Sequence, residues 1–188
     1  MIVERPYQRE RAVAYALRWA LDRNPLFYDF VGIGGDCTNF VSQAVLAGSC
    51  VMNNTPTYGW YFRSLSDRSP SWTGVEYFYD FLTEAPEFAS ANGGIGPFGR
   101  EVPARLATLG DVIQLADDTG DFYHTLIITA VTPDDFLVCA HTNDALNRPL
   151  STYTYARARF LHIDGVRTEF PAAEPCFLDL LHGVALPQ

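Results

Sequence analysis

One cysteine, Cys37, stands where the chain could make a thiol reactive. The segment 34–43 (GGDCTNFVSQ) has two glycines, which permit a tight turn, followed by Asp36, a residue favoured just before a helix. Apolar residues then recur at helical spacing until Gly48. The pattern predicts a helix that starts near Cys37, where free N–H groups and the positive end of the helix dipole favour the nucleophilic thiolate.

A thiol nucleophile needs a proton acceptor, and imidazole suits that role because it titrates near neutral pH. Among the four histidines, His124 opens an alternating stretch at 123–131, and His141 ends the next such stretch at 136–141. The two remaining histidines have no second polar group suited to work with them. The sequence therefore favours His124 as the base, with His141 close by.

The connection between these two stretches decides which side chains meet. A turn centred at 133–134 would place His124 opposite Asn143 and diagonal to His141, with all three on one face of the sheet. His141 or Asn143 could then accept a hydrogen bond from the His124 ring and fix its tautomer. A shift of half a residue in the turn would bring a neighbour such as Asp144 opposite His124 instead.

Two other interpretations of these residues stay open. Cys37 falls on the apolar stripe of its own helix, and buried cysteines are often inert. Alternatively, Cys37, His124, Cys139 and His141 have the side-chain types that bind zinc, although the sequence lacks the closely spaced ligand pairs of zinc modules. It also lacks a Gly-x-Ser-x-Gly elbow, a phosphate-binding loop and a His-Glu-x-x-His motif, so we expect neither a metal nor a cofactor.

The elements that would position these residues follow from periodicity. Helical spacing predicts helices at 7–21, 37–48 and 75–82, and alternation predicts strands at 111–116, 123–131, 136–141 and 158–163. The segments 49–72 and 92–97 are expected to be loops. Helices followed by strands are typical of an α+β fold with an antiparallel sheet, and we expect a single domain over residues 1–188.

Aromatic residues are concentrated in the segment 49–72. Trp60, Tyr61 and Trp72, together with Tyr123 beside the candidate base, could line a substrate groove. The same rings could equally cover the core. If they formed a groove while Cys37 was inert, the protein would be a binding module for a glycan or peptide, without catalytic activity.

The overall composition narrows the range of partners. The 188 residues carry a formal charge of −9, which argues against nucleic acid or an anionic membrane surface. With no membrane span and no secretion leader in the sequence, we expect a soluble protein, cytoplasmic by default. Cys37, Cys50, Cys139 and Cys176 show no CxxC spacing, so we expect no disulfide scaffold and a reducing compartment.

Several segments together resemble a family of amidase domains found in bacterial proteins. The most specific is the run at 34–43, followed in the same order by His124 and by HTND at 141–144. The other matching segments are 7–20, 71–73, 110–112 and 147–150. The resemblance covers a core of about residues 7–163 and leaves 164–188 as a C-terminal extension. This family is similar to the NlpC/P60 and CHAP groups of papain-like cysteine hydrolases.

The resemblance implies a papain-like α+β fold, in which a cysteine at a helix N-terminus packs against an antiparallel sheet that carries the base. Under this resemblance Cys37 is the nucleophile, His124 the general base and His141 the orienting residue, as in NlpC/P60 proteins. Asn143 is the papain-like alternative for the third role. Tyr28, upstream of the cysteine, would support the oxyanion together with the backbone N–H of Cys37.

The activity implied by the resemblance is amide hydrolysis through a thioester acyl-enzyme. The substrate would be a peptidoglycan peptide or the amide that joins this peptide to the sugar. The same centre could instead transfer the acyl group to an amine. Thr38 and Asn39 replace the Ser-Gly pair typical of NlpC/P60 proteins, so the substrate rules of that group do not carry over.

Overall fold

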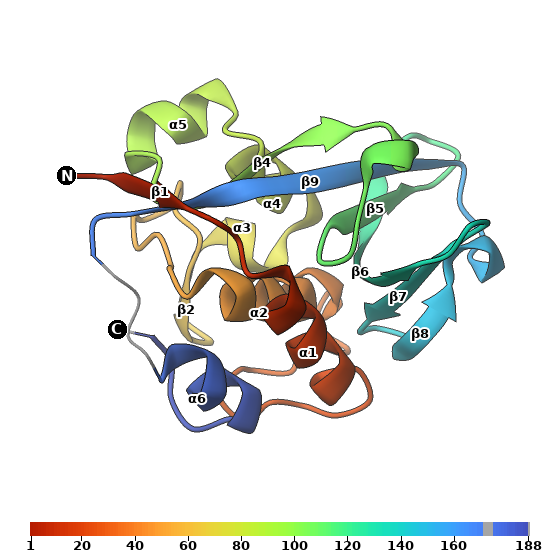
Figure 1. Ribbon diagram of the computed structural model, residues 1–188, viewed down its shortest axis with the longest axis horizontal. Coiled ribbons are helices and arrows are strands. Elements are labelled where there is room, and N and C mark those ends of the chain that lie inside the picture. The colour runs from red at the N-terminus through yellow and green to blue at the C-terminus, as the bar shows by residue number, and fades with distance from the viewer. Residues whose placement is uncertain (171–174, 188) are drawn as a thin grey trace.

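The computed structural model describes residues 1–170 and 175–187, in which one seven-stranded sheet is covered by helices (Figure 1). The strand order is β1-β9-β5-β6-β7-β8, with β4 also paired to β9, and every pairing is antiparallel. The strands are β1 (Val3–Arg5), β4 (Gly96–Val102), β5 (Val112–Ala116), β6 (Phe122–Val131), β7 (Phe136–Ala140), β8 (Ala145–Pro149) and β9 (Arg157–Thr168). The predicted α+β class and antiparallel sheet are confirmed.

The helices within the described ranges are four to thirteen residues long. They are α1 (Arg9–Trp19), α2 (Cys37–Ser49), α3 (Pro70–Thr73), α4 (Val75–Leu82), α5 (Pro86–Asn92) and α6 (Cys176–His182), with a small hairpin of β2 (Phe62–Ser64) and β3 (Asp67–Arg68) before α3. In Figure 1, α1 and α2 lie side by side next to β6 and β7. No helix within the described ranges is both long and apolar enough to cross a membrane.

Side-chain alternation along the strands creates two apolar clusters. Val112 and Ile127, which pair across β5 and β6, belong to the larger cluster with α1 and α2. Ile113 and Leu126, the next pair, belong to a smaller cluster on the other face. Successive residues of a strand point to opposite faces, so each position in β6 is assigned to the α2 face or to the opposite face.

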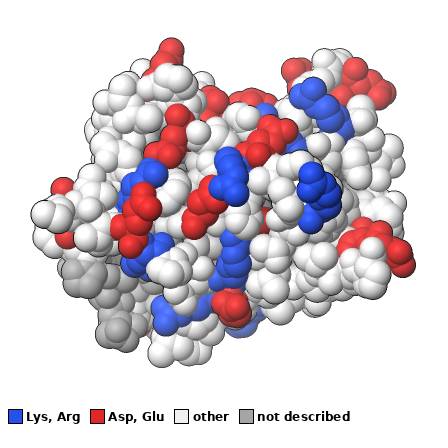
Figure 2. Space-filling view, turned by 45° about the horizontal axis from the view of Figure 1, so that its top comes forward, with Lys and Arg blue, Asp and Glu red and all other residues white. Residues whose placement is uncertain are grey.

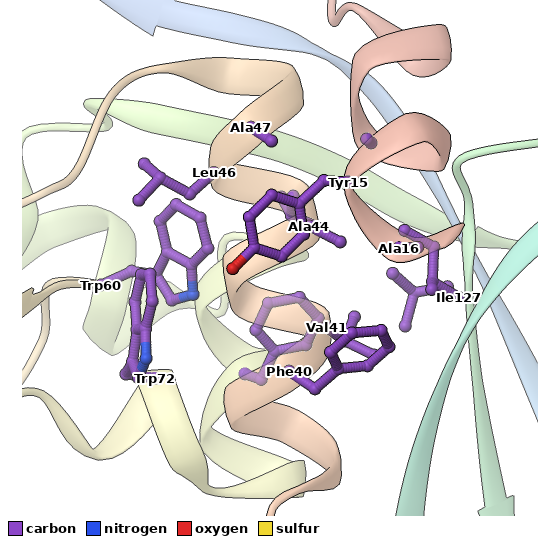
Figure 3. Close-up of a cluster of buried hydrophobic side chains, with 14 of the residues drawn as sticks. Tyr15, Ala16, Phe40, Val41, Ala44, Leu46, Ala47, Trp60, Trp72 and Ile127 are labelled. Carbon is purple, nitrogen blue, oxygen red and sulfur yellow. The ribbon is translucent and has the colours of Figure 1, made fainter. Parts of the chain in front are cut away.

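Helix α2 is buried along its whole length, since all thirteen of its residues are buried. Figure 3 shows the indole rings of Trp60 and Trp72 on one side of α2 and Ile127 of the sheet on the other. Both tryptophans have no exposed surface, and Tyr61 is 8% exposed. The prediction that Trp60 and Trp72 line a substrate groove is therefore wrong, because their rings are part of the core. Tyr61 lies outside this cluster, with the Arg63 guanidinium over its ring. Tyr123 remains exposed.

The polar side chains of this buried helix all have partners, as burial requires. Asn39 Oδ1 accepts a hydrogen bond from the Trp72 indole, and the Ser42 hydroxyl accepts one from the Trp60 indole. Gln43 Oε1 accepts a hydrogen bond from the Tyr15 hydroxyl. Much of the polar character of the motif at 34–43 thus serves to satisfy buried groups.

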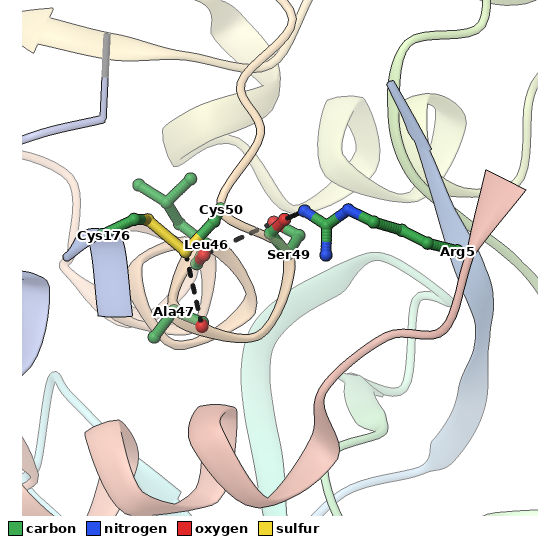
Figure 4. Close-up of a disulfide and its surroundings, with 6 residues drawn as sticks. All are labelled: Arg5, Leu46, Ala47, Ser49, Cys50 and Cys176. Carbon is green, nitrogen blue, oxygen red and sulfur yellow. Dashed lines mark hydrogen bonds between the residues drawn. A yellow bond between two sulfur atoms is a disulfide. The ribbon is translucent and has the colours of Figure 1, made fainter. Parts of the chain in front are cut away.

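A disulfide joins Cys50, directly after α2, to Cys176, the first residue of α6 (Figure 4). Arg5 donates a hydrogen bond to the carbonyl of Ser49 beside it. The expectation of a chain without a disulfide is wrong for this pair, because two cysteines that are 126 residues apart meet at the end of α2. Cys37 and Cys139 are free and buried.

Several elements differ from the sequence prediction for local reasons. Helix α5 was not predicted; it begins at Pro86, a position that proline favours because no backbone donor is needed there. Part of the expected loop at 92–97 forms the end of α5 and the start of β4. β4 pairs with β9, whose strand extends past the predicted end at residue 163 to Thr168.

Charge is spread over the surface in small groups of mixed sign. On the face in Figure 2, acidic and basic side chains are interleaved. Arg167, for example, donates hydrogen bonds to both Glu4 and Glu84. All 13 basic residues of the chain are arginines.

Candidate active site

Cys37 is the first residue of α2, as the sequence predicted. Its side chain is 7% exposed. The Thr38 hydroxyl lies within hydrogen-bonding distance of the sulfur, at 3.9 Å, and the backbone of Thr125 in β6 approaches the sulfur. Burial raises the pKa of the Cys37 thiol, and these hydrogen bonds only partly oppose that effect. The helix start was expected to favour the thiolate, and burial of the sulfur works against that effect.

His124 lies near the start of β6, directly before Thr125. Burial, with a smaller contribution from the positive charge of Arg148, lowers the pKa of His124 to about 4. The rings of Tyr123 and Tyr153 flank the imidazole, at centroid distances of 6.2 and 6.1 Å. No hydrogen bond engages its ring nitrogens in the described parts of the chain. His124 is thus a neutral, uncommitted proton acceptor.

The cysteine and the histidine come from segments that are in contact. The hydroxyls of Thr38 and Thr125, the residues that directly follow Cys37 and His124, are 2.8 Å apart. Thr125 points to the α2 face of the sheet, so alternation places His124 toward the opposite face, where Tyr153 packs. Within residues 1–170 and 175–187, no hydrogen bond joins the Cys37 sulfur to the His124 ring. Catalytic hydrogen bonds are often long or absent without substrate.

The low pKa of His124 gives a testable dependence of stability on pH. His124 takes up a proton at about pH 6.5 when unfolded but only at about pH 4 when folded, so the unfolded state gains stability as the pH falls between these values. Stability from this residue is present at pH 7, and about 2 kcal/mol of it is lost by pH 5. His124→Gln should show a correspondingly smaller loss in urea unfolding at the two pH values.

The exposed residue His182 provides the matched control for this measurement. His182→Gln should keep the wild-type change in unfolding free energy between pH 7 and pH 5. An equal pH dependence in wild type and His124→Gln would contradict the buried, neutral state of His124.

His141 lies directly after β7. Its Nδ1–H donates to Asp36 Oδ2 at 2.6 Å, and its Nε2 lies 2.9 Å from the carbonyl oxygen of Trp19. The ring stacks on Phe40 at a centroid distance of 4.0 Å. His141 and Asp36 are each 1% exposed. The structure therefore joins His141 to the residue before the cysteine and not to the candidate base.

The strand register explains this difference from the sequence prediction. Ile127 pairs with Cys139, whereas the expected turn would pair it with Ala140. A shift of one residue moves side chains to the other face of a sheet. His141 consequently points to the α2 face, and the predicted placement of His124, His141 and Asn143 on one face is wrong.

Asp36 precedes α2 but does not cap it with its side chain. Instead, its Oδ1 accepts hydrogen bonds from the backbone N–H of Phe30 and from Asn39 Nδ2, in addition to the His141 bond at Oδ2. Its own N–H donates to the Thr142 hydroxyl at 2.7 Å. Asp36 therefore ties the turn before Cys37 to the loop after β7.

The remaining predicted site residues lie around this connection. Asp144 forms a two-pronged ion pair with Arg23, at 2.9 and 3.0 Å. Asn143 has a positive φ of 67° in the loop after β7. The carbonyl of Tyr28 accepts a hydrogen bond from Asn39, and its ring is 37% exposed. Sequence reasoning missed Arg23, for which no motif gave a signal.

Breaking the Asp36–His141 pair should destabilise the protein markedly. Asp36→Asn removes a buried charge that accepts three hydrogen bonds and leaves His141 facing an amide, so we expect the free energy of unfolding to fall by about 3 kcal/mol. Asp144→Asn is the control, since its ion pair with Arg23 is partly exposed and should contribute less than about 1 kcal/mol. Urea unfolding measures both values, and equal costs would contradict the assignment.

A second histidine–aspartate pair involves the segment 110–112, one of the segments that carry the family resemblance. His162 Nδ1 lies 2.7 Å from Asp111 Oδ2, and Arg9 contacts Asp111 Oδ1 at 2.5 Å. Asp111 is fully buried. The prediction that His162 lacks a polar partner is wrong, since β5 and β9 are adjacent in the sheet.

Among the described residues, no group of three or more His, Cys, Asp or Glu side chains could hold a metal ion, and the alternative zinc site does not form.

Comparison with known proteins identifies the family. Residues 6–163 match the family model described as "Putative amidase domain". The chain belongs to this amidase family. The matched part of the amidase domain ends within β9 and leaves α6 outside. The predicted amidase resemblance is therefore confirmed.

One curated relative of this amidase domain is "Uncharacterized protein YhbB" of Bacillus subtilis (strain 168). It is 33% identical over 167 residues, which cover 84% of this chain and 50% of the relative. The chain thus spans about half the length of the curated relative that it matches. No solved structure matches the chain.

Proposed function

We propose that this amidase domain hydrolyses amides through Cys37, with His124 as general base and acid. The observation that carries the proposal is the meeting of the two segments: the hydroxyls of Thr38 and Thr125, the residues that follow Cys37 and His124, lie 2.8 Å apart. His124 is the buried histidine whose nitrogens have no partner in the described structure, whereas both nitrogens of His141 face other groups. The family description supports amide hydrolysis as the reaction.

The reaction then has two stages. The Cys37 thiol gives its proton to His124 as the sulfur attacks the amide carbonyl, and the protonated imidazole passes that proton to the leaving amine. A thioester remains on Cys37 while the amine departs. Water, deprotonated by His124, attacks the thioester and releases the acid and the free thiol. The first intrahelical hydrogen bond of α2 runs from the N–H of Phe40 to the carbonyl of Asp36, so the N–H of Cys37 can donate to the oxyanion. Tyr28 is the candidate side-chain donor.

Both reacting groups are neutral at rest, because burial raises the pKa of Cys37 and lowers that of His124. Proton transfer therefore accompanies the attack on the carbonyl and does not precede it. The third role assigned by resemblance to His141 becomes a positioning role: through Asp36, His141 fixes the turn that presents Cys37. In this proposal Tyr123 and Tyr153 hold the His124 ring by packing.

For the substrate, we propose a peptidoglycan peptide or the amide joining it to the sugar, as the resemblance to NlpC/P60 and CHAP proteins implies. The net charge of −9 suits a substrate with free amines. The Cys50–Cys176 disulfide favours an oxidising compartment over the expected reducing one. The burial of Trp60 and Trp72 removes the basis of the alternative glycan-binding module.

The test combines product detection with capture of the intermediate. Peptidoglycan fragments that keep their own amines and the sugar–peptide amide are incubated with the protein, and the increase in primary amines over the substrate alone is measured with an amine-reactive dye. The chain has no lysine, so its only amine is the N-terminus and the background is low. Acid quenching and mass spectrometry should reveal an acyl adduct on the peptide that contains Cys37. Amine release that persists without any adduct at Cys37 would contradict the proposal.

An added amine distinguishes hydrolysis from transfer. A hydrolase releases the free acid even in the presence of glycinamide, whereas an acyltransferase gives the amide of that nucleophile as its main product.

A further inference from the structure

We propose that a buried chain of hydrogen bonds, Arg159–Gln114–Thr125–Thr38, directs a hydroxyl proton at the Cys37 sulfur and so positions the nucleophile. This inference rests on the proposed role of Cys37. The four residues of the chain, called the relay below, are positioning residues, since none of them exchanges a proton with substrate.

The relay crosses three neighbouring strands on the α2 face of the sheet. Gln114 of β5 pairs with Thr125 of β6 on one side and with Arg159 of β9 on the other. Arg159 Nε lies 2.7 Å from Gln114 Oε1, and Gln114 Nε2 lies 3.4 Å from the Thr125 hydroxyl. The Thr125 and Thr38 hydroxyls are 2.8 Å apart, and the Thr38 hydroxyl is 3.9 Å from the Cys37 sulfur.

Each bond in the relay has a direction, and Arg159 sets it. A guanidinium only donates, so the Gln114 oxygen faces Arg159 and its NH₂ group faces the other way. That NH₂ group donates to the carbonyl of Val75 at 2.9 Å and to the Thr125 hydroxyl. Thr125 then has its own proton to donate, and the Thr38 hydroxyl is the acceptor that the described residues offer. Thr38 is left to donate to the sulfur.

Arg159 is held firmly enough to serve as the fixed end of the relay. Its guanidinium lies 3.7 Å from the ring centroids of both Tyr79 and Phe122, and its Nη2 donates to Glu76 at 3.1 Å. Arg159 is 8% exposed, and Gln114, Thr125 and Thr38 have no exposed surface. A buried arginine in an otherwise apolar sheet needs such partners, and here they fix the orientation of the Gln114 amide.

Other charged groups near Cys37 act independently of the relay. Asp36, the preceding residue, opposes ionisation of the thiol. His141 lies against Asp36 from the end of β7, and His124 projects from β6. Glu76 approaches from the start of α4 but is bound to Arg159. None of these groups is changed by substitutions of the relay hydroxyls.

The test is the pH dependence of alkylation of Cys37 by iodoacetamide, followed by mass spectrometry of the Cys37 peptide. Thr38→Val and Thr125→Val keep the side-chain shape but remove one relay hydroxyl each. We expect each to move the midpoint of the alkylation profile upward by about one pH unit, which slows alkylation about tenfold at pH 7. Thr38→Ser, which retains the hydroxyl, should restore the wild-type midpoint.

A matched control comes from the same strand and face. The Thr129 hydroxyl of β6 lies 2.6 Å from Asn147 Oδ1 and 3.1 Å from the Leu137 carbonyl, outside the relay, so Thr129→Val should leave the midpoint unchanged. Gln114→Glu reverses the direction of the hydrogen bond to Thr125, because a carboxylate accepts from both Arg159 and Thr125. This variant should also raise the midpoint of the alkylation profile. It replaces a valine variant that does not fold. An unchanged midpoint in folded Thr38→Val or Gln114→Glu, or an equal shift in Thr129→Val, would overturn the proposal.

The alkylation assay uses no substrate, so its outcome is separate from that of the hydrolysis test. If the relay fails, Cys37 can still prove to be the nucleophile. If Cys37 proves not to be the nucleophile, the effect of the relay on the thiol can still be measured.

Discussion

Replacing Cys37 with alanine should reduce amide hydrolysis by about 10⁴-fold or more, because the proposed reaction cannot form its thioester without the sulfur. Only one atom and its hydrogen are lost, and α2 keeps its contacts with α1 and the sheet. We therefore expect the melting temperature to remain close to that of the wild type. The increase in primary amines from the same peptidoglycan fragments measures the activity.

Cys139 gives the matched control for this substitution. It is the other free cysteine, fully buried in β7 on the same apolar cluster as α2. Cys139→Ala should retain activity within about tenfold while losing some stability from the cavity it leaves. Activity in Cys37→Ala that matches Cys139→Ala would exclude Cys37 as the nucleophile.

Removing the disulfide should have the largest effect on stability. Cys50 and Cys176 enclose a long stretch of chain, with a sequence separation of 126, and the entropy of closing such a loop corresponds to about 5 kcal/mol. The double variant Cys50→Ala, Cys176→Ala should therefore melt about 10–20 °C below the wild type. Thermal unfolding followed by circular dichroism measures this difference.

A reducing agent provides the internal comparison. Dithiothreitol should lower the melting temperature of the wild type but leave that of the double variant unchanged. Titration of thiols in unreduced, denatured protein should find the two free cysteines, Cys37 and Cys139. Four reactive thiols would show that the disulfide had not formed in the isolated protein.

The local elements near Cys37 could be predicted because their patterns are strong. Glycines, an aspartate and apolar residues at helical spacing identified α2 from Cys37 onward, and alternation identified β5, β6 and β7. Patterns that depend on distant partners could not be recognised in this way. β4 contains Gly96, Pro97 and Gly99, which disfavour strands, and it forms because the long strand β9 offers it an edge.

The residues of the candidate site were easier to predict than their contacts. His124 and His141 follow from strand periodicity, but which of them faces α2 depends on a single residue of register. Asp36 was expected to cap α2 and instead binds His141. Gln114, a polar residue inside the apolar strand VIQLA, was a signal that could have led to the relay, since a buried amide requires partners.

The complete burial of α2 has a consequence for motion at this site. All residues of α2 are buried, so we expect the amide hydrogens beyond its first turn to exchange only when the fold opens. Cys37 is the first residue of that helix, so we expect its position to stay fixed on the timescale of a catalytic cycle. Tyr123, which packs beside His124, is 47% exposed. Whatever fluctuation brings thiol and imidazole together must therefore take place on the histidine side.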